Sequence, residues 1–257
     1  MKYNALCIFL LCLTLFCAGC VAPLGGQSGD LPSQEVAVFA AASLTEVFTA
    51  AGAAFEQNHP QTALTFNFAG SQQLASQLAE GAPAALFASA DQRQMDAVVS
   101  AGRIAPASVV LFACNRLVVV SSSESVASLR DLTAPGVKLV IGAQAVPVGA
   151  YTLAFLTAAA ADPAYGEPFR SGVLANIVSY EQSVRAVLSK VRLGEADAGI
   201  VYATDAQTAP EVAVLEIPAH LNQLAGYQIA PLSDGSSPEV AAQFLDFLRS
   251  PEGEQTL

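Results

Sequence analysis

Five positions in this chain of 257 residues could together hold an anion without a charged side chain. They stand at or just after the ends of short apolar runs: Ser43, Ser71, Val148, Val184 and Tyr202. The first four lie where a helix is expected to begin, and a helix N-terminus presents unpaired N–H groups and a partial positive charge. The serine and tyrosine hydroxyls add further donors. Several such turns aimed at one point would form an anion cage.

Each of these residues also has a purely structural interpretation. Serine is a common helix cap, so Ser43 or Ser71 alone indicates a cap as readily as a ligand. Tyr202 alone is typical of a core aromatic whose hydroxyl reaches water. Val148 and Val184 could offer only backbone groups. The hypothesis therefore depends on all five positions meeting at one place.

The elements that would position these residues follow from an alternation of apolar runs and helical patterns. We expect strands over residues 35–41, 63–68, 84–88, 117–121, 137–142, 176–180 and 198–202. Helices are expected over about 72–80, 93–101, 150–161 and 183–194, the first and last ending at Gly81 and Gly194. Ser43-Leu44-Thr45-Glu46 matches a capping box and predicts a helix to about Asn58. This alternation predicts an α/β fold with parallel strands, whose carboxyl ends are where ligands bind.

Composition narrows the classes of function. Hydrophobic residues make up 53% of the chain and charged residues 13%, which predicts a buried core and excludes a disordered chain. The formal net charge of −11 argues against a nucleic acid or an anionic membrane surface as partner. Two histidines, His59 and His220, leave little material for a histidine-based metal site.

The N-terminus resembles the signal of a lipoprotein. Lys2 is the only charge before Asp30, and the apolar run Ala5–Phe16 leads into Cys17-Ala18-Gly19-Cys20. This pattern resembles a bacterial lipobox, so we expect residues 1–19 to be a signal peptide and Cys20 to be lipidated, with residues 20–34 as the lipidated cysteine and flexible tether. An ordinary cleaved signal is the alternative. Loss of Lys2 would leave a net charge of −12.

After such processing Cys114 would be the one cysteine without a lipid, so no internal disulfide is expected. Cys114 follows the apolar run 109–113. That setting predicts a buried, unreactive thiol.

An ordered set of short segments resembles the periplasmic molybdate-binding proteins of ABC importers. The segments span most of residues 35–206 in the order of that family: Val38-Phe39-Ala40-Ala41-Ala42-Ser43-Leu44-Thr45, Phe68-Ala69-Gly70-Ser71, Gly81-Ala82-Pro83-Ala84, Ser89-Ala90-Asp91-Gln92, Asn115-Arg116-Leu117-Val118-Val119-Val120, Val146-Pro147-Val148-Gly149-Ala150-Tyr151 and Gly194-Glu195-Ala196-Asp197-Ala198-Gly199-Ile200-Val201-Tyr202. Each segment alone is weakly specific, whereas the ordered set is specific.

The resemblance implies a two-lobed periplasmic-binding-protein fold of type II, with parallel-rich sheets flanked by helices and a ligand cleft between the lobes. Lobe 1 would comprise residues 35–114 plus 219–257, and lobe 2 residues 115–218. It implies a monomeric, extracytoplasmic solute-binding protein that is not an enzyme and uses no cofactor, and the lipobox-like motif predicts that this protein is lipid-anchored. Its partners would be molybdate or tungstate and an ABC importer, a permease with its ATPase.

The resemblance also implies a role for each of the five positions as an oxyanion (metal) ligand. Ser43 and Ser71 would donate hydroxyl and backbone N–H groups, Val148 and Val184 backbone N–H groups, and Tyr202 its hydroxyl. Arg116 would be structural. Many family members have alanine where Val148 stands, and residues 250–257 stop about where the family usually continues into a further tail.

A cage made only of donors suits a fully deprotonated tetrahedral dianion. Protonated phosphate is disfavoured because none of the five positions is acidic, and sulfate is smaller than molybdate. Tungstate is nearly the same size as molybdate, so a tungstate-specific or sulfate-binding protein of this fold is an open alternative. So are an iron-binding protein, which would need clustered tyrosines, and a serine hydrolase using Ser43 or Ser71 with His59 or His220 as base.

Overall fold

The computed structural model describes residues 34–255. The predicted signal peptide, the lipidation site at Cys20 and the tether up to residue 33 lie outside the described residues. Within the described part, no helix is both long and apolar enough to cross a membrane.

The first sheet contains β2 (Thr62–Ala69), β1 (Gln34–Ala41), β3 (Leu86–Ser89), β9 (Leu224–Pro231) and part of β4 (Val110–Ser121), in that order. β1 pairs in parallel with β2 and β3. β9 is antiparallel to both β3 and β4. The last described strand thus inserts between two earlier ones, so the chain returns to the sheet in which it began.

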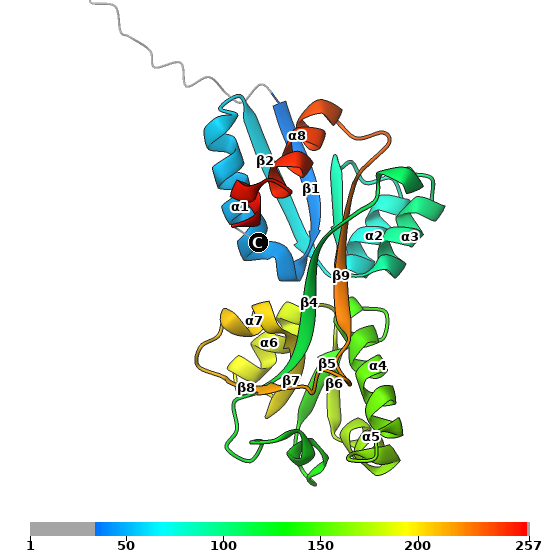
Figure 1. Cartoon of the computed structure of the whole chain (residues 1–257), viewed down its shortest axis with the longest axis vertical. Coiled ribbons are helices and arrows are strands. Elements are labelled where there is room, and N and C mark those ends of the chain that lie inside the picture. The colour runs from blue at the N-terminus through cyan, green and yellow to red at the C-terminus, as the bar shows by residue number, and fades with distance from the viewer. Residues whose placement is uncertain (1–33, 256–257) are drawn as a thin grey trace, which may run out of the picture. The chain divides into compact units, whose positions relative to one another are not determined.

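The second sheet continues from β4 through β7 (Ala198–Tyr202) and β5 (Leu139–Gly142) to β6 (Ile177–Glu181), while β8 (Ala213–Glu216) also pairs with β4. β5 is parallel to β6 and β7, whereas β4 is antiparallel to β7 and β8. Residues 110–116 of β4 pair with β9, and residues 117–121 pair with β7. β4 therefore runs from one sheet into the other, with β9 alongside it (Figure 1).

Side chains of β1 alternate between two cores, as the two-residue period of a strand requires. Val36, Val38 and Ala40 join the cluster that contains residues of α1 (Thr45–Asn58) and α8 (Pro238–Leu248). Phe39 joins a second cluster with residues of α2 (Ser71–Ala79) and α3 (Gln92–Ser100). The first sheet is therefore covered by helices on both faces.

The second sheet is covered in the same way (Figure 1). On one side are α4 (Pro147–Ala161) and α5 (Gly166–Ala175), and on the other α6 (Val184–Arg192) and the short α7 (Ala203–Gln207). The remaining described elements are the 3-10 turns η1 (Ala42–Leu44), η2 (Pro106–Ser108) and η3 (Leu129–Thr133), and the final turn α9 (Pro251–Glu254). The α/β class predicted from the alternation of elements is confirmed.

Two predictions about β4 are wrong. The strand begins at Val110 rather than near residue 117, because its first half alternates between exposed and partly buried residues instead of forming a uniformly apolar run. Cys114 lies on the exposed side of this alternation, so its thiol is exposed and not buried as expected.

Candidate functional site

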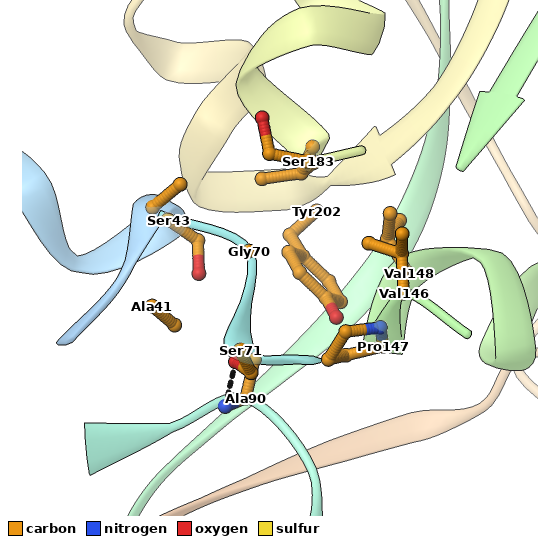
Figure 2. Close-up of a pocket in the computed structure, with 12 residues that line it drawn as sticks. Ala41, Ser43, Gly70, Ser71, Ala90, Val146, Pro147, Val148, Ser183 and Tyr202 are labelled. Carbon is orange, nitrogen blue, oxygen red and sulfur yellow. Dashed lines mark hydrogen bonds between the residues drawn. The ribbon is translucent and has the colours of Figure 1, made fainter. Parts of the chain in front are cut away.

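The five positions line one cavity with about 220 Å³ of space between its atoms, open solvent included. Its other lining residues are small or apolar or carry one hydroxyl: Ala41, Ala42, Gly70, Ala90, Val146, Pro147 and Ser183. Figure 2 shows the Tyr202 phenol among the residues of these turns. A water-sized sphere can occupy only about 10 Å³ of this cavity, far below the roughly 300 Å³ at which sites for drug-sized molecules begin, so the cavity suits a very small ligand.

The topology explains why the five positions meet. Ser43 and Ser71 follow the neighbouring strands β1 and β2 of the first sheet. Val148 and Val184 follow β5 and β6 of the second sheet, and Tyr202 is the last residue of β7. All five thus stand at carboxyl ends of parallel strands, where α/β sheets place their ligands.

Ser43 is held differently from the prediction. It lies inside the 3-10 turn η1, and the helix that follows begins at Thr45 without a side-chain cap, so the predicted capping box is wrong. The Ser43 Oγ instead accepts a hydrogen bond of 2.9 Å from the hydroxyl of Tyr227. A serine oxygen that already accepts retains its own proton for a further partner.

Ser71 has the same arrangement on the next turn. It is the first residue of α2 and is 1% exposed. Its Oγ accepts a hydrogen bond of 3.1 Å from the backbone N–H of Ala90, drawn as a dashed line in Figure 2. The Ser71 hydroxyl proton is therefore also available to an acceptor in the cavity.

The N-termini of α4 and α6, which follow strands of the second sheet, complete the lining of the cavity. α4 begins at Pro147, which has no N–H, so the first free donors of that helix come from Val148 and Gly149. A β-carbon at Gly149 would lie 2.1 Å from the carbonyl oxygen of Ala143, so only glycine permits this tight turn. At α6 the Ser183 side chain caps Ala186 at 3.2 Å, and Val184 is the first helical residue.

Tyr202 carries a side-chain polar group in the cavity that lacks a protein partner. Its side chain is 1% exposed, and its hydroxyl makes no hydrogen bond within the described chain. Burial raises the pKa of the Tyr202 phenol well above its ordinary value, and Tyr227 and Tyr151 raise it further. The phenol is therefore a neutral donor. Leaving a buried polar group unpaired costs about 1–3 kcal/mol, which a ligand accepting this bond would recover.

The cavity lining described here contains no Asp, Glu, Lys, Arg or His. Within residues 34–255 there is also no cluster of three or more His, Cys, Asp or Glu side chains that could hold a bare metal ion. The donors are hydroxyl and backbone N–H groups, which stabilise a negative charge and offer nothing to a cation. This chemistry fits an anion that carries no proton.

Direct contacts join the two sheets' elements beside the cavity. Gln72 Nε2 donates to the Gln182 carbonyl oxygen at 2.9 Å, and Gln94 Nε2 donates to the Ala145 carbonyl oxygen at 3.1 Å. The two acceptors lie in the loops that lead into α6 and α4. Side chains of α2 and α3, the helices that pack on the first sheet, thus bind the two loops that lead into α6 and α4 of the second sheet.

An ion pair at the start of α6 spans the same gap. The Arg185 guanidinium pairs with Glu46 of α1 and lies 2.8 Å from Asp205 Oδ1, without the angle of a hydrogen bond to that oxygen. The Asp205 side chain is fully buried. Burial raises the pKa of Asp205 to about 7, although Arg185 opposes this change. The Asp205 carboxyl therefore gains and loses its proton near neutral pH.

Neither histidine can serve the cavity serines as a base. The His59 ring stacks on Phe55 with centroids 3.9 Å apart, at the end of α1. His220 pairs with Asp162 at 2.9 Å and is exposed. Neither residue lines the cavity. Arg116 is likewise outside it, in an exposed pair with Glu216.

Tyr227 is the contact that the sequence analysis missed. The signal was present in Leu224–Pro231, where Ala225, Tyr227 and Ile229 are buried at alternate positions of β9. Such an alternation predicts a half-buried strand, but nothing local indicates that it would run beside the turn after β1, 184 residues away.

Comparison with known proteins places these features in a family. Residues 36–257 match the family model described as bacterial extracellular solute-binding protein. The molybdate-binding protein ModA of Mycobacterium bovis is 38% identical over 239 residues, covering 91% of this chain and 85% of that protein. A putative ABC transporter substrate-binding lipoprotein of Bacillus subtilis, YvgL, is 30% identical over 98% of this chain and 94% of its own length.

A solved structure shows the same fold. The periplasmic molybdate-binding protein of Azotobacter vinelandii superimposes with a TM-score of 0.73 at 21% identity, covering 86% of this chain and 95% of that one. This similarity confirms the predicted periplasmic-binding-protein fold class.

Proposed function

Because the chain belongs to the family of bacterial extracellular solute-binding proteins, we propose that it captures molybdate in the cavity at the five turns and delivers it to an ABC importer. As a solute-binding protein it is not an enzyme, so molybdate is its cargo and not a cofactor. The observation that carries the proposal is the Tyr202 hydroxyl, which is buried without a protein partner among helix N-termini and serine hydroxyls.

In this proposal the five residues act as neutral donors. Ser43 and Ser71 offer their hydroxyl protons because each oxygen already accepts from the protein. Val148 and Val184 offer backbone N–H groups from the first turns of α4 and α6, and Tyr202 offers its phenol. Hydrogen bonds to a charged group contribute roughly 1.5–3 kcal/mol each, so this set supports micromolar or tighter binding, about −8 kcal/mol, after ordering and desolvation costs.

The same donors determine selectivity. A protonated anion would place its proton against a protein donor, which disfavours hydrogen phosphate. Sulfate is smaller than molybdate, so a rigid cage would hold it with longer, weaker bonds. Tungstate is nearly the size of molybdate, so we expect the site to bind both. The acidic net charge does not oppose this, because distant charges are screened within about 8 Å at physiological salt.

Capture would proceed by closure of two lobes, residues 35–114 plus 219–257 and residues 115–218. Ser43 and Ser71 belong to the first lobe, and the other three ligands to the second. An anion that contacts both lobes only when the cleft is shut favours the closed state. The importer would then recognise that closed form.

We also propose that Cys20 is lipidated and anchors the mature protein outside the cytoplasm. Support comes from the Cys17-Ala18-Gly19-Cys20 motif and from the lipoprotein relative of Bacillus subtilis. Metabolic labelling with an alkyne fatty acid should mark the wild-type protein and leave the Cys20→Ser variant unlabelled. If the wild type and the Cys20→Ser variant are both labelled, the lipid is attached at a residue other than Cys20.

Anion titrations test the function itself. With purified protein, molybdate and tungstate should raise the melting temperature and change the tyrosine fluorescence, a usable signal because the chain has six Tyr and no Trp. Sulfate should act only at much higher concentration, and phosphate weakest of all. A protein that responds to none of the four anions, or prefers phosphate, would contradict the proposal.

A further inference from the structure

Tyr227 lies behind the cavity and not in its lining. It belongs to β9, the strand that returns to the first sheet, and its side chain is 2% exposed. Its hydroxyl donates to Ser43 Oγ at 2.9 Å. The bond joins the returning strand to the turn after β1, which is a long-range contact between two buried side chains.

We propose that Tyr227 is a positioning residue that fixes Ser43 as a donor to the bound anion. A serine hydroxyl has one proton and can accept at its lone pairs. While Tyr227 donates to that oxygen, the geometry leaves the Ser43 proton free for the cavity. The inference rests on the proposed function, since it requires an anion to receive this proton.

The direction of the Tyr227–Ser43 bond is itself supported by its surroundings. The Tyr227 hydroxyl donates its own proton to Ser43 Oγ, and both side chains are buried. Burial raises the pKa of Tyr227 far above its ordinary value, so that proton is kept. The Tyr227 phenol therefore remains a neutral donor to Ser43.

The direction of the hydrogen bond from Tyr227 to Ser43 affects selectivity as well as affinity. Without the Tyr227 hydroxyl, Ser43 could rotate and accept a proton from a ligand. The site would then lose part of its discrimination against protonated oxyanions. A residue that only supported the packing of β9 would lower stability without changing that discrimination.

The test is a double-mutant cycle between Tyr227→Phe and Ser43→Ala, read by calorimetric titration with sodium molybdate. Tyr227→Phe should weaken binding about three- to tenfold, the range expected for one hydrogen bond. In the Ser43→Ala background the same change should have no further effect. The affinity ratio of sulfate to phosphate should also fall in Tyr227→Phe.

Tyr151→Phe is the matched control. Its ring also packs against Tyr202, with centroids 6.5 Å apart, but no hydrogen bond joins it to Ser43. It should change molybdate affinity by less than about twofold. If Tyr227→Phe is too unstable to titrate, Tyr227→Met removes the hydroxyl while keeping an apolar side chain, and the cycle is repeated with it.

Two outcomes overturn the inference. One is an unchanged molybdate affinity in Tyr227→Phe, and the other is an equal loss with and without the Ser43 hydroxyl. Either leaves the proposed function standing, provided that the wild-type protein binds molybdate. If the wild-type protein binds no molybdate, tungstate or sulfate, the proposed function itself is wrong. Failure of the proposed function is thus distinguished from failure of the inference about Tyr227.

Discussion

A β-carbon at Gly70 would stand 2.3 Å from the carbonyl oxygen of Gln182. Gly70 caps α2 after the first sheet, and Gln182 lies in the loop before α6 of the second. The φ of Gly70 is −59°, which any residue can adopt, so glycine is needed for the close approach and not for its own conformation. In the proposed closure, the two backbones would meet in this way only when the lobes are shut.

Gly70→Ala should therefore weaken molybdate binding without unfolding the protein. The added methyl group opposes closure at a cost of about 1–3 kcal/mol, equivalent to roughly a 5- to 150-fold loss of affinity. Calorimetry measures the affinity and a thermal melt measures the ligand-free stability. Gly226→Ala is the control, because its β-carbon would meet only the Leu111 side chain, at 3.1 Å. A Gly70→Ala protein with normal affinity would show that closure does not require this approach.

Gln94 provides a second test of closure. Its amide donates to the Ala145 carbonyl oxygen at 3.1 Å and does not line the cavity. Gln94→Met keeps the volume but removes the bond, so molybdate should bind about three- to tenfold more weakly and dissociate faster. The ratio of molybdate to sulfate affinity should stay the same, because the donors around the anion are unchanged.

Gln77→Met is the matched control for that experiment. Gln77 of α2 accepts a hydrogen bond from Asn67 of β2, and this bond does not link elements of the first sheet to those of the second. Stopped-flow tyrosine fluorescence would measure the dissociation rates. Equal rates for the two variants and the wild type would rule out Gln94 as a link that holds the closed state.

Asp205 makes stability depend on pH. Because burial raises its pKa to about 7 in the folded protein, from 3.8, the folded state binds this proton more tightly than the unfolded state does. The free energy of unfolding should therefore fall as pH rises from about 4 to 7, by about 2–3 kcal/mol between pH 5 and pH 8. Urea unfolding at the two pH values measures the difference.

In Asp205→Asn this part of the pH dependence should disappear, and the variant should be more stable than the wild type at pH 8. The asparagine keeps the size of the side chain and a neutral acceptor for Arg185. The same slope in both proteins would assign the pH dependence to other groups.

The sequence predicted much of this architecture because the strongest signals are local. The helix from Thr45 ends at Asn58 as expected, and Gly81 and Gly194 follow their helices with φ of 99° and 69°. The five candidate positions could be placed at strand ends from the alternation alone, and the structure brings all five to one cavity.

The failures concern long-range pairing. The capping box at Ser43 was a sound local match, but the serine bonds to Tyr227, which nothing near it in sequence could reveal. Cys114 was expected to be buried because the run before it is apolar, whereas β4 exposes alternate residues there. The antiparallel insertion of β9 and the links from Gln72 and Gln94 likewise depend on how distant segments pack.

The Tyr202 phenol gives the most direct test of a cage built from neutral donors. Calorimetric titration with molybdate should show about ten- to hundredfold weaker binding to Tyr202→Phe than to the wild type, as expected for one bond to a charged ligand. The ligand-free melting temperature should stay the same or rise, because the change removes a buried hydroxyl that has no protein partner. Equal molybdate affinity in the two proteins would contradict the account.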